Sequence, residues 1–145
     1  MKTSIITSVL VAFVSVMSLS AGNPRTTVYE NVETTDAGVK KEYVKYNNEI
    51  SAADSKVVYF YDADGKMDSK VFYKWNSQEG WVENQKYEYQ YNNENQVSYL
   101  TFTKWDDKNK AEMEQLVHIY DNDGNLMAVE KIDLNNEDVA YAGNK

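Results

Sequence analysis

Hydrophobic and polar residues alternate along most of the chain after residue 23, and the clearest stretches end in the same kind of loop. In each stretch a tyrosine is followed by Asp or Asn, and a Gly or Asn comes three residues after that. The tyrosines and their loop residues are Tyr61 with Gly65, Tyr91 with Asn95 and Tyr120 with Gly124. A three-residue hairpin loop needs a left-handed residue at its last position, which Gly and Asn adopt most easily. The pattern predicts three repeated β-hairpins.

These repeats predict an all-β fold without a sizeable helix. A weaker fourth copy spans residues 36–46. We expect an antiparallel meander of about seven or eight strands, built from three to four repeated hairpins. It would form a single curled sheet or a partly open barrel. The loop 106–114 is the only place where we expect a helical turn.

The shared loop also predicts the register of the strands. It sets Tyr61 opposite Met67, and the corresponding pairs follow in the other two hairpins. Extending the period of two from these pairs puts most Tyr and Trp residues, with His118, on one face, which we predict to be buried. The opposite face then carries seven apolar residues: Phe60, Phe72, Leu100, Phe102, Val117, Ile119 and Val129.

Apolar residues on a nominally outer face need a cover or a partner. One interpretation is that the N-terminal segment 24–56 folds over them, or that the sheet curls. The other is that they contact a protein or a ligand, and self-association is one form of this. The candidate interaction surface consists of Phe60, Phe72, Leu100, Phe102, Ile119 and Val129, with Trp81 from the loop after Gly80.

The first residues are typical of a secretory signal peptide. Lys2 is followed by an uncharged apolar stretch over residues 5–19 and then by small residues around Ala21 and Gly22. We expect a signal peptide over 1–22, a single domain over 23–145, and a secreted or periplasmic protein with no membrane span after signal removal. Without Lys2 the chain has 14 basic and 23 acidic residues, a net charge of −9, which disfavours nucleic-acid binding.

Candidate chemistry is sparse. The loops that begin at Asp62 and Asp121 resemble the start of a calcium loop, but Tyr73 and Ile132 stand where such a loop has its final Glu. A hairpin loop explains their Asp and Gly residues without a metal. His118 is the only histidine, and we expect it to be a packed, hydrogen-bonded core residue. We therefore expect no metal and no cofactor.

The sequence contains no nucleophile elbow, no phosphate loop and no cysteine. Acidic pairs at 106–107 and 136–138 fall in polar loops, where solvated charge is the ordinary state. We therefore expect that the protein is not an enzyme. The expected function is a non-catalytic protein-interaction module. The alternative is a carbohydrate-binding accessory protein that uses exposed aromatic residues, because the chain has 12 Tyr and 3 Trp. The partner would thus be a protein or a glycan.

Two resemblances bear on this expectation. The Tyr-Asp-x-x-Gly hairpin unit is similar to the tyrosine–aspartate repeats of secreted bacterial proteins. Most of the chain after the signal resembles a family of small exported Bacteroides proteins catalogued as a domain of unknown function. The segments that carry this second resemblance are 23–32, 80–82, 85–89, 116–124 and 126–129. It implies an envelope or secreted location and transfers no functional residues.

Overall fold

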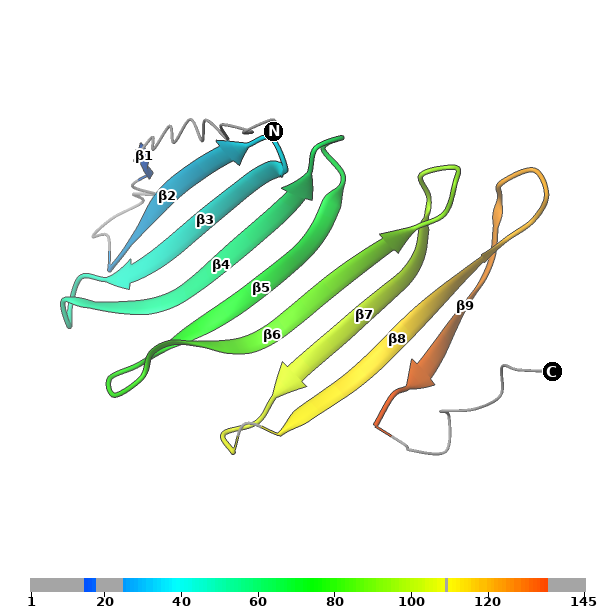
Figure 1. Cartoon of the computed structure of the whole chain (residues 1–145). Coiled ribbons are helices and arrows are strands. Elements are labelled where there is room, and N and C mark those ends of the chain that lie inside the picture. Colours follow the sequence, from blue (N-terminus) through cyan, green and yellow to red (C-terminus); the bar gives the residue numbers. More distant parts are fainter. Residues whose placement is uncertain (1–14, 18–24, 109, 136–145) are drawn as a thin grey trace, which may run out of the picture.

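The computed structural model describes residues 15–17, 25–108 and 110–135, and within them the chain forms one antiparallel sheet. Nine strands follow one another across this sheet in the order of the sequence, so the predicted all-β meander is confirmed (Figure 1). The strands are β1 (Ser15–Met17), β2 (Thr26–Thr35), β3 (Gly38–Asn47), β4 (Ala52–Asp62), β5 (Met67–Asn76), β6 (Gly80–Tyr91), β7 (Val97–Trp105), β8 (Ala111–Tyr120) and β9 (Leu126–Asp133). No helix in this part of the chain is long and apolar enough to cross a membrane.

Each predicted hairpin loop is held by a side-chain oxygen at its first residue. Asp62 Oδ1 accepts hydrogen bonds from the backbone N–H groups of Asp64, at 3.0 Å, and Lys66, at 2.8 Å. The loops that begin at Asn92 and Asp121 repeat both bonds. Gly65 and Gly124 have φ values of 81° and 82°, and Asn95 has 62°. The predicted left-handed positions are therefore confirmed.

A fourth loop of this kind lies at the opposite end of the sheet, where a helical turn was expected. Asp106 Oδ1 accepts hydrogen bonds from the backbone N–H groups of Lys108, at 2.8 Å, and Lys110, at 2.9 Å. The expectation for 106–114 was wrong, because β8 already begins at Ala111. The sequence signal was present: Trp105 and Asp106 repeat the aromatic–Asp pair that opens the other loops.

The predicted register is confirmed at the three loops, but it changes one step further along each hairpin. Tyr61 pairs with Met67, Tyr91 with Val97, and Tyr120 with Leu126. Directly beyond these pairs each hairpin has a β-bulge, whose extra residue on the second strand is Asp68, Ser98 or Met127. One extra residue reverses the alternation of all residues after it. The predicted faces are therefore correct for the first strand of each of these three hairpins and wrong for the second strand.

The observed register defines two faces of the sheet. The lysine face carries Lys41, Tyr59, Lys70, Tyr87 and Phe102, which are successive partners in one row across β3–β7. The tryptophan face carries Val58 and Val71, which pair with each other, and all three tryptophans: Trp75, Trp81 and Trp105.

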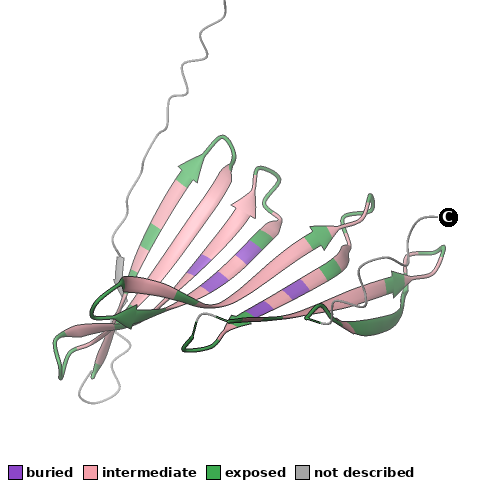
Figure 2. Cartoon of the chain, turned by 60° about the horizontal axis from the view of Figure 1, so that its bottom comes forward, coloured by how far each residue is buried: buried purple, intermediate pink, exposed green. Residues whose placement is uncertain are grey.

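The sheet has little buried core. The buried residues of the described chain all lie on the tryptophan face, and they are Val58, Ser69, Val71, Thr101 and Thr103 (Figure 2). Val58 and Val71 are flanked in their row by Glu42 and Lys86. The prediction that the face of Tyr59 and Tyr89 is the buried one was wrong, since both are only half-buried. On the tryptophan face, small side chains such as Val58 and Val71 are buried between longer neighbours in their row.

The N-terminal segment does not cover the sheet. Residues 26–35 and 38–47 form β2 and β3, which extend the meander and pair residue by residue with each other. The interpretation that 24–56 folds over a face was therefore wrong, and the weak fourth repeat is a hairpin. β1, which pairs with β2, belongs to the predicted signal peptide. The predicted cleavage after Ala21 or Gly22 lies outside the described residues.

Tyrosine hydroxyls join neighbouring hairpins near their loops. Tyr91 Oη donates to the carbonyl oxygen of Met67 at 2.7 Å, and Tyr120 Oη donates to that of Val97 at 2.8 Å. Each tyrosine thus binds the residue that follows the loop of the preceding hairpin. Burial raises the pKa of Tyr91, with smaller contributions from Tyr89 and nearby carboxylates. A raised pKa keeps the hydroxyl protonated, so it remains a donor.

Replacement of Gly65 by Ala tests the loop conformation. No atom lies within 4 Å of a Cβ built at Gly65, so the substitution adds backbone strain and no clash. We expect a loss of about 1–2 kcal/mol in the free energy of unfolding, measured by urea denaturation. Gly65→Asn is the control and should lose less, because Asn95 occupies the equivalent place at φ 62°. Equal stability of all three proteins would contradict the role of the loop.

Replacement of Tyr91 by Phe tests the link between hairpins. The substitution removes the hydroxyl that donates to the carbonyl oxygen of Met67, and it leaves the ring in place. We expect thermal and urea unfolding to show a loss of about 1 kcal/mol. The control is Tyr99→Phe, because this ring is 39% exposed and its hydroxyl makes no hydrogen bond with a described residue. If both variants lose the same stability, the link contributes nothing.

Candidate binding face

The lysine face is the strongest candidate for a binding surface because it combines aromatic rings with unpaired charge. Its paired positions in β3–β7 hold no Asp or Glu. They hold five lysines: Lys41, Lys45, Lys70, Lys74 and Lys104. In a chain with net charge −8, this is a local reversal of sign, limited to the middle of the face, because the flanking strands place Glu30, Glu112, Glu114 and Asp133 on the same side.

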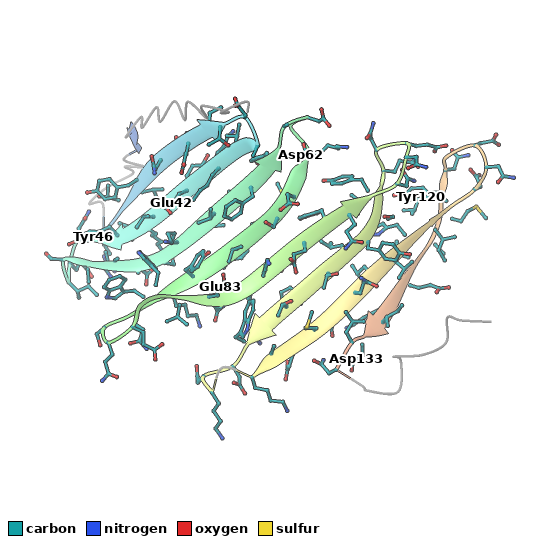
Figure 3. The ribbon with its side chains drawn as sticks, in the orientation of Figure 1. Glu42, Tyr46, Asp62, Glu83, Tyr120 and Asp133 are labelled. Carbon is teal, nitrogen blue, oxygen red and sulfur yellow. The ribbon has the colours of Figure 1, made fainter. Side chains whose placement is uncertain are left out.

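Aromatic side chains form a nearly continuous band across this face. The ring centroids of Phe72 and Tyr87 are 6.2 Å apart, and those of Tyr87 and Phe102 are 4.8 Å apart. A second pair, Tyr43 and Tyr59, lies 5.8 Å apart in an edge-to-face arrangement. Such contacts stabilise the band beyond simple burial. All these rings are half-buried, and side chains of the described residues project from one layer of strands (Figure 3).

Lys70 connects the two aromatic groups. Its Nζ lies 5.1 Å from the ring centroid of Tyr59 and 4.7 Å from that of Phe72. Lys41 similarly lies 5.4 Å from the ring centroid of Tyr61. A ring attracts a cation but does not neutralise its charge. These lysines therefore stay available to an anionic group.

The predicted interaction residues are divided between the two faces. Phe72, Leu100, Phe102 and Val129 lie on the lysine face, whereas Phe60, Ile119 and Trp81 lie on the tryptophan face. The prediction that the apolar residues share one face opposite the tyrosines was wrong for the first group, which lies on the face of Tyr59 and Tyr87. The cause is the bulge in each hairpin, which no local pattern in the sequence marks.

The three tryptophans gather at one end of the tryptophan face. Trp75 and Trp81 pair across β5 and β6, with ring centroids 5.1 Å apart in an edge-to-face arrangement. Trp75 is 47% exposed. A cavity of about 310 Å³ lies beside them, where the β5–β6 and β7–β8 hairpins end. Its lining includes Trp75, Trp105, Asn76, Asn84 and the carboxylates of Glu79, Glu83, Asp106 and Asp107.

Trp81 also belongs to a cluster that sequence reasoning missed. Lys56 Nζ lies 4.7 Å from the ring centroid of Tyr73, 4.9 Å from that of Trp81, and 3.6 Å from Glu42 Oε2. Burial raises the pKa of Tyr73, and Glu83 adds to the increase. The cluster depends on the bulge at Asn84, which brings Tyr73 opposite Glu83. Trp81 is therefore half-buried among neighbours rather than free in a loop.

The other predicted chemical groups have local structural roles. Asp62 and Asp121 bind backbone N–H groups of their own loops, and Asn125 also donates to Asp121, which lowers the pKa of that carboxyl. The described residues contain no group of three His, Asp or Glu side chains placed to hold a metal.

His118 is half-buried on the lysine face. The expectation of a hydrogen-bonded histidine was wrong for its Nδ1, which is buried without a partner. Asp106 and Asp107 line the tryptophan cavity, and residues 136–138 lie outside the described residues.

The comparisons with known proteins identify a family but no activity. No curated protein matches the chain. One solved structure resembles it, a DUF3836 family protein from Bacteroides vulgatus ATCC 8482, with 21% identity, a TM-score of 0.39, and coverage of 73% of this chain and 98% of that one. The model of the family of unknown function DUF3836 matches residues 1–112, which is most of the chain. The chain therefore belongs to the DUF3836 family.

Proposed function

We propose that this chain is an exported, non-catalytic interaction module that docks a protein partner over its lysine face. The single observation that carries the proposal is the row of half-buried rings formed by Phe72, Tyr87 and Phe102 on a one-layer sheet. A sheet gains most of its stability when at least one face packs against another element. A partner over this row would supply the missing layer.

A partner on the lysine face would gain free energy by burying apolar side chains that the sheet leaves half-buried. Burying a large apolar side chain fully stabilises a structure by about 1.5–3 kcal/mol relative to leaving it exposed. None of the described side chains of the lysine face is buried, so much of this gain is still open there. The tryptophan face already covers Val58 and Val71 beneath its neighbours. The tryptophan face also exposes large apolar side chains, among them Trp75 and Tyr99, so the choice of the lysine face rests on its aromatic band and its lysines.

Export is part of the proposal. The apolar stretch over residues 5–19, the basic Lys2 and the small residues near Ala21 support it. In an oxidising compartment a chain without cysteine depends on packing and hydrogen bonds alone. A partner layer would compensate for the small core of this sheet.

A second candidate function is carbohydrate binding at the tryptophan cavity. Trp75 offers an exposed ring for stacking against a sugar. The surrounding carboxylates and the amides of Asn76 and Asn84 offer hydrogen-bonding groups for hydroxyls. The observation that favours it is the gathering of all three tryptophans at one end of one face. Lys74 of the lysine face also lines this cavity, so the two candidate sites adjoin at that residue.

Site-specific photo-crosslinking tests the protein-docking proposal. A benzophenone amino acid placed at Tyr89, on the lysine face, should form a discrete protein adduct in cells that export the chain. The same amino acid at Tyr99 is the control, because Tyr99 is in the neighbouring strand on the tryptophan face and is 39% exposed. Gel shift and mass spectrometry would identify the adducts. Equal labelling from both positions, or none from Tyr89, would refute docking on this face.

Replacement of Trp75 by Ala tests the second candidate. If the cavity binds sugars, affinity electrophoresis through neutral polysaccharides should show retardation of the parent chain and its loss in Trp75→Ala. Tyr99→Ala removes an exposed ring from the same face away from the cavity and should keep the retardation. Failure of the parent chain to bind across a glycan array would exclude the carbohydrate function.

A further inference from the structure

We infer that the partner segment that docks on the lysine face is an acidic peptide segment that also carries apolar side chains. This inference rests on the proposed docking function and specifies the chemistry of the partner. It follows from how the two faces of the same sheet treat their lysines.

On the tryptophan face every lysine in the paired positions of β3–β7 has a carboxylate partner. Lys40 lies 3.9 Å from Glu33, Lys56 lies 3.6 Å from Glu42, and Lys86 lies 2.7 Å from Glu88. The charges of this face are therefore neutralised within the chain. The lysines of the tryptophan face therefore give no reason to expect an anionic partner there.

On the lysine face, most lysines of the same strands form no ion pair within the described residues. Lys45 is the exception, at 3.4 Å from Asp54. Among the described residues, no carboxylate oxygen lies within 4.0 Å of the Nζ atoms of Lys41, Lys70, Lys74 and Lys104. Lys74 and Lys104 are exposed. Two of these lysines still have acidic neighbours: Glu112 is the cross-strand partner of Lys104, and Lys74 lines a cavity with Glu79, Glu83, Asp106 and Asp107. Lys41 and Lys70 have only uncharged cross-strand partners.

The positions of the lysines among the rings indicate which side chains the partner segment carries. Along one row, Lys41, Tyr59, Lys70, Tyr87 and Phe102 follow one another across five strands about 4.8 Å apart, so cations alternate with rings. On β5, Lys70 and Lys74 flank Phe72 on the same face, roughly 13 Å apart. A segment with carboxylates alone would leave the rings exposed. A segment with apolar side chains alone would desolvate the lysines without pairing them.

A charge-reversal pair tests this inference. The probe is a fluorescent random copolymer of glutamate and tyrosine, and binding is measured by fluorescence anisotropy at low salt. We expect Lys74→Glu combined with Lys104→Glu to weaken binding at least tenfold. The matched control combines Lys108→Glu with Lys110→Glu, two exposed loop lysines at the end of the sheet, and should change affinity less than twofold. Circular dichroism melting would verify that both variants fold.

The outcomes separate the inference from the function on which it rests. A copolymer of lysine and tyrosine should not bind the parent chain, and added salt should weaken binding of the acidic copolymer. Equal loss in both double variants, or no binding of the acidic copolymer, overturns the inference. Tighter binding of polygalacturonate also overturns it in favour of an acidic polysaccharide. The crosslinks from Tyr89 test protein docking independently of these binding experiments.

Discussion

The structure depends on one small interaction, the acceptance of two backbone N–H groups by the side-chain oxygen at the first loop residue. Asp62, Asn92 and Asp121 make it at one end of the sheet, and Asp106 makes it at the other. This interaction closes a three-residue loop without help from a core. It suits a chain whose sheet has only one layer, because each turn is stabilised within its own sequence.

Contacts between loops add to the strand pairing that joins the hairpins into one sheet. Lys66 Nζ donates to Asn95 Oδ1 at 2.9 Å, and Gln96 Nε2 donates to the carbonyl oxygen of Gly124 at 2.8 Å. The middle loop departs from the repeat at these two positions, where it has Asn95 and Gln96. The departure is therefore explained: both side chains reach the loops on either side. Tyr91 adds its own bond to the preceding hairpin.

The β-bulges convert this regular stack into a sheet with two unlike faces. Each bulge moves the apolar residues of a second strand to the side opposite that expected from a period of two. Phe72 and Phe102 thereby join Tyr87 in one aromatic band, and Val71 moves to lie beside Val58. The same register places Lys70 between the rings of Tyr59 and Phe72 on one face and leaves Lys86 beside Glu88 on the other. The candidate binding face is thus a product of the bulges.

The sequence by itself determined the strands, their antiparallel order, the loops and the register at each loop, because these depend on neighbours in the chain and on the left-handed preference of Gly and Asn. Only the tertiary structure decided which side chains share a face. Asp68, Ser98 and Met127 look like ordinary strand residues, and their extra position exists only relative to a partner strand. Of the predicted surface, Phe72, Leu100, Phe102 and Val129 lie on the face of the tyrosines, whereas Phe60 and Ile119 lie on the predicted face together with Trp81. A single residue of register, fixed between strands, reverses every side chain beyond it.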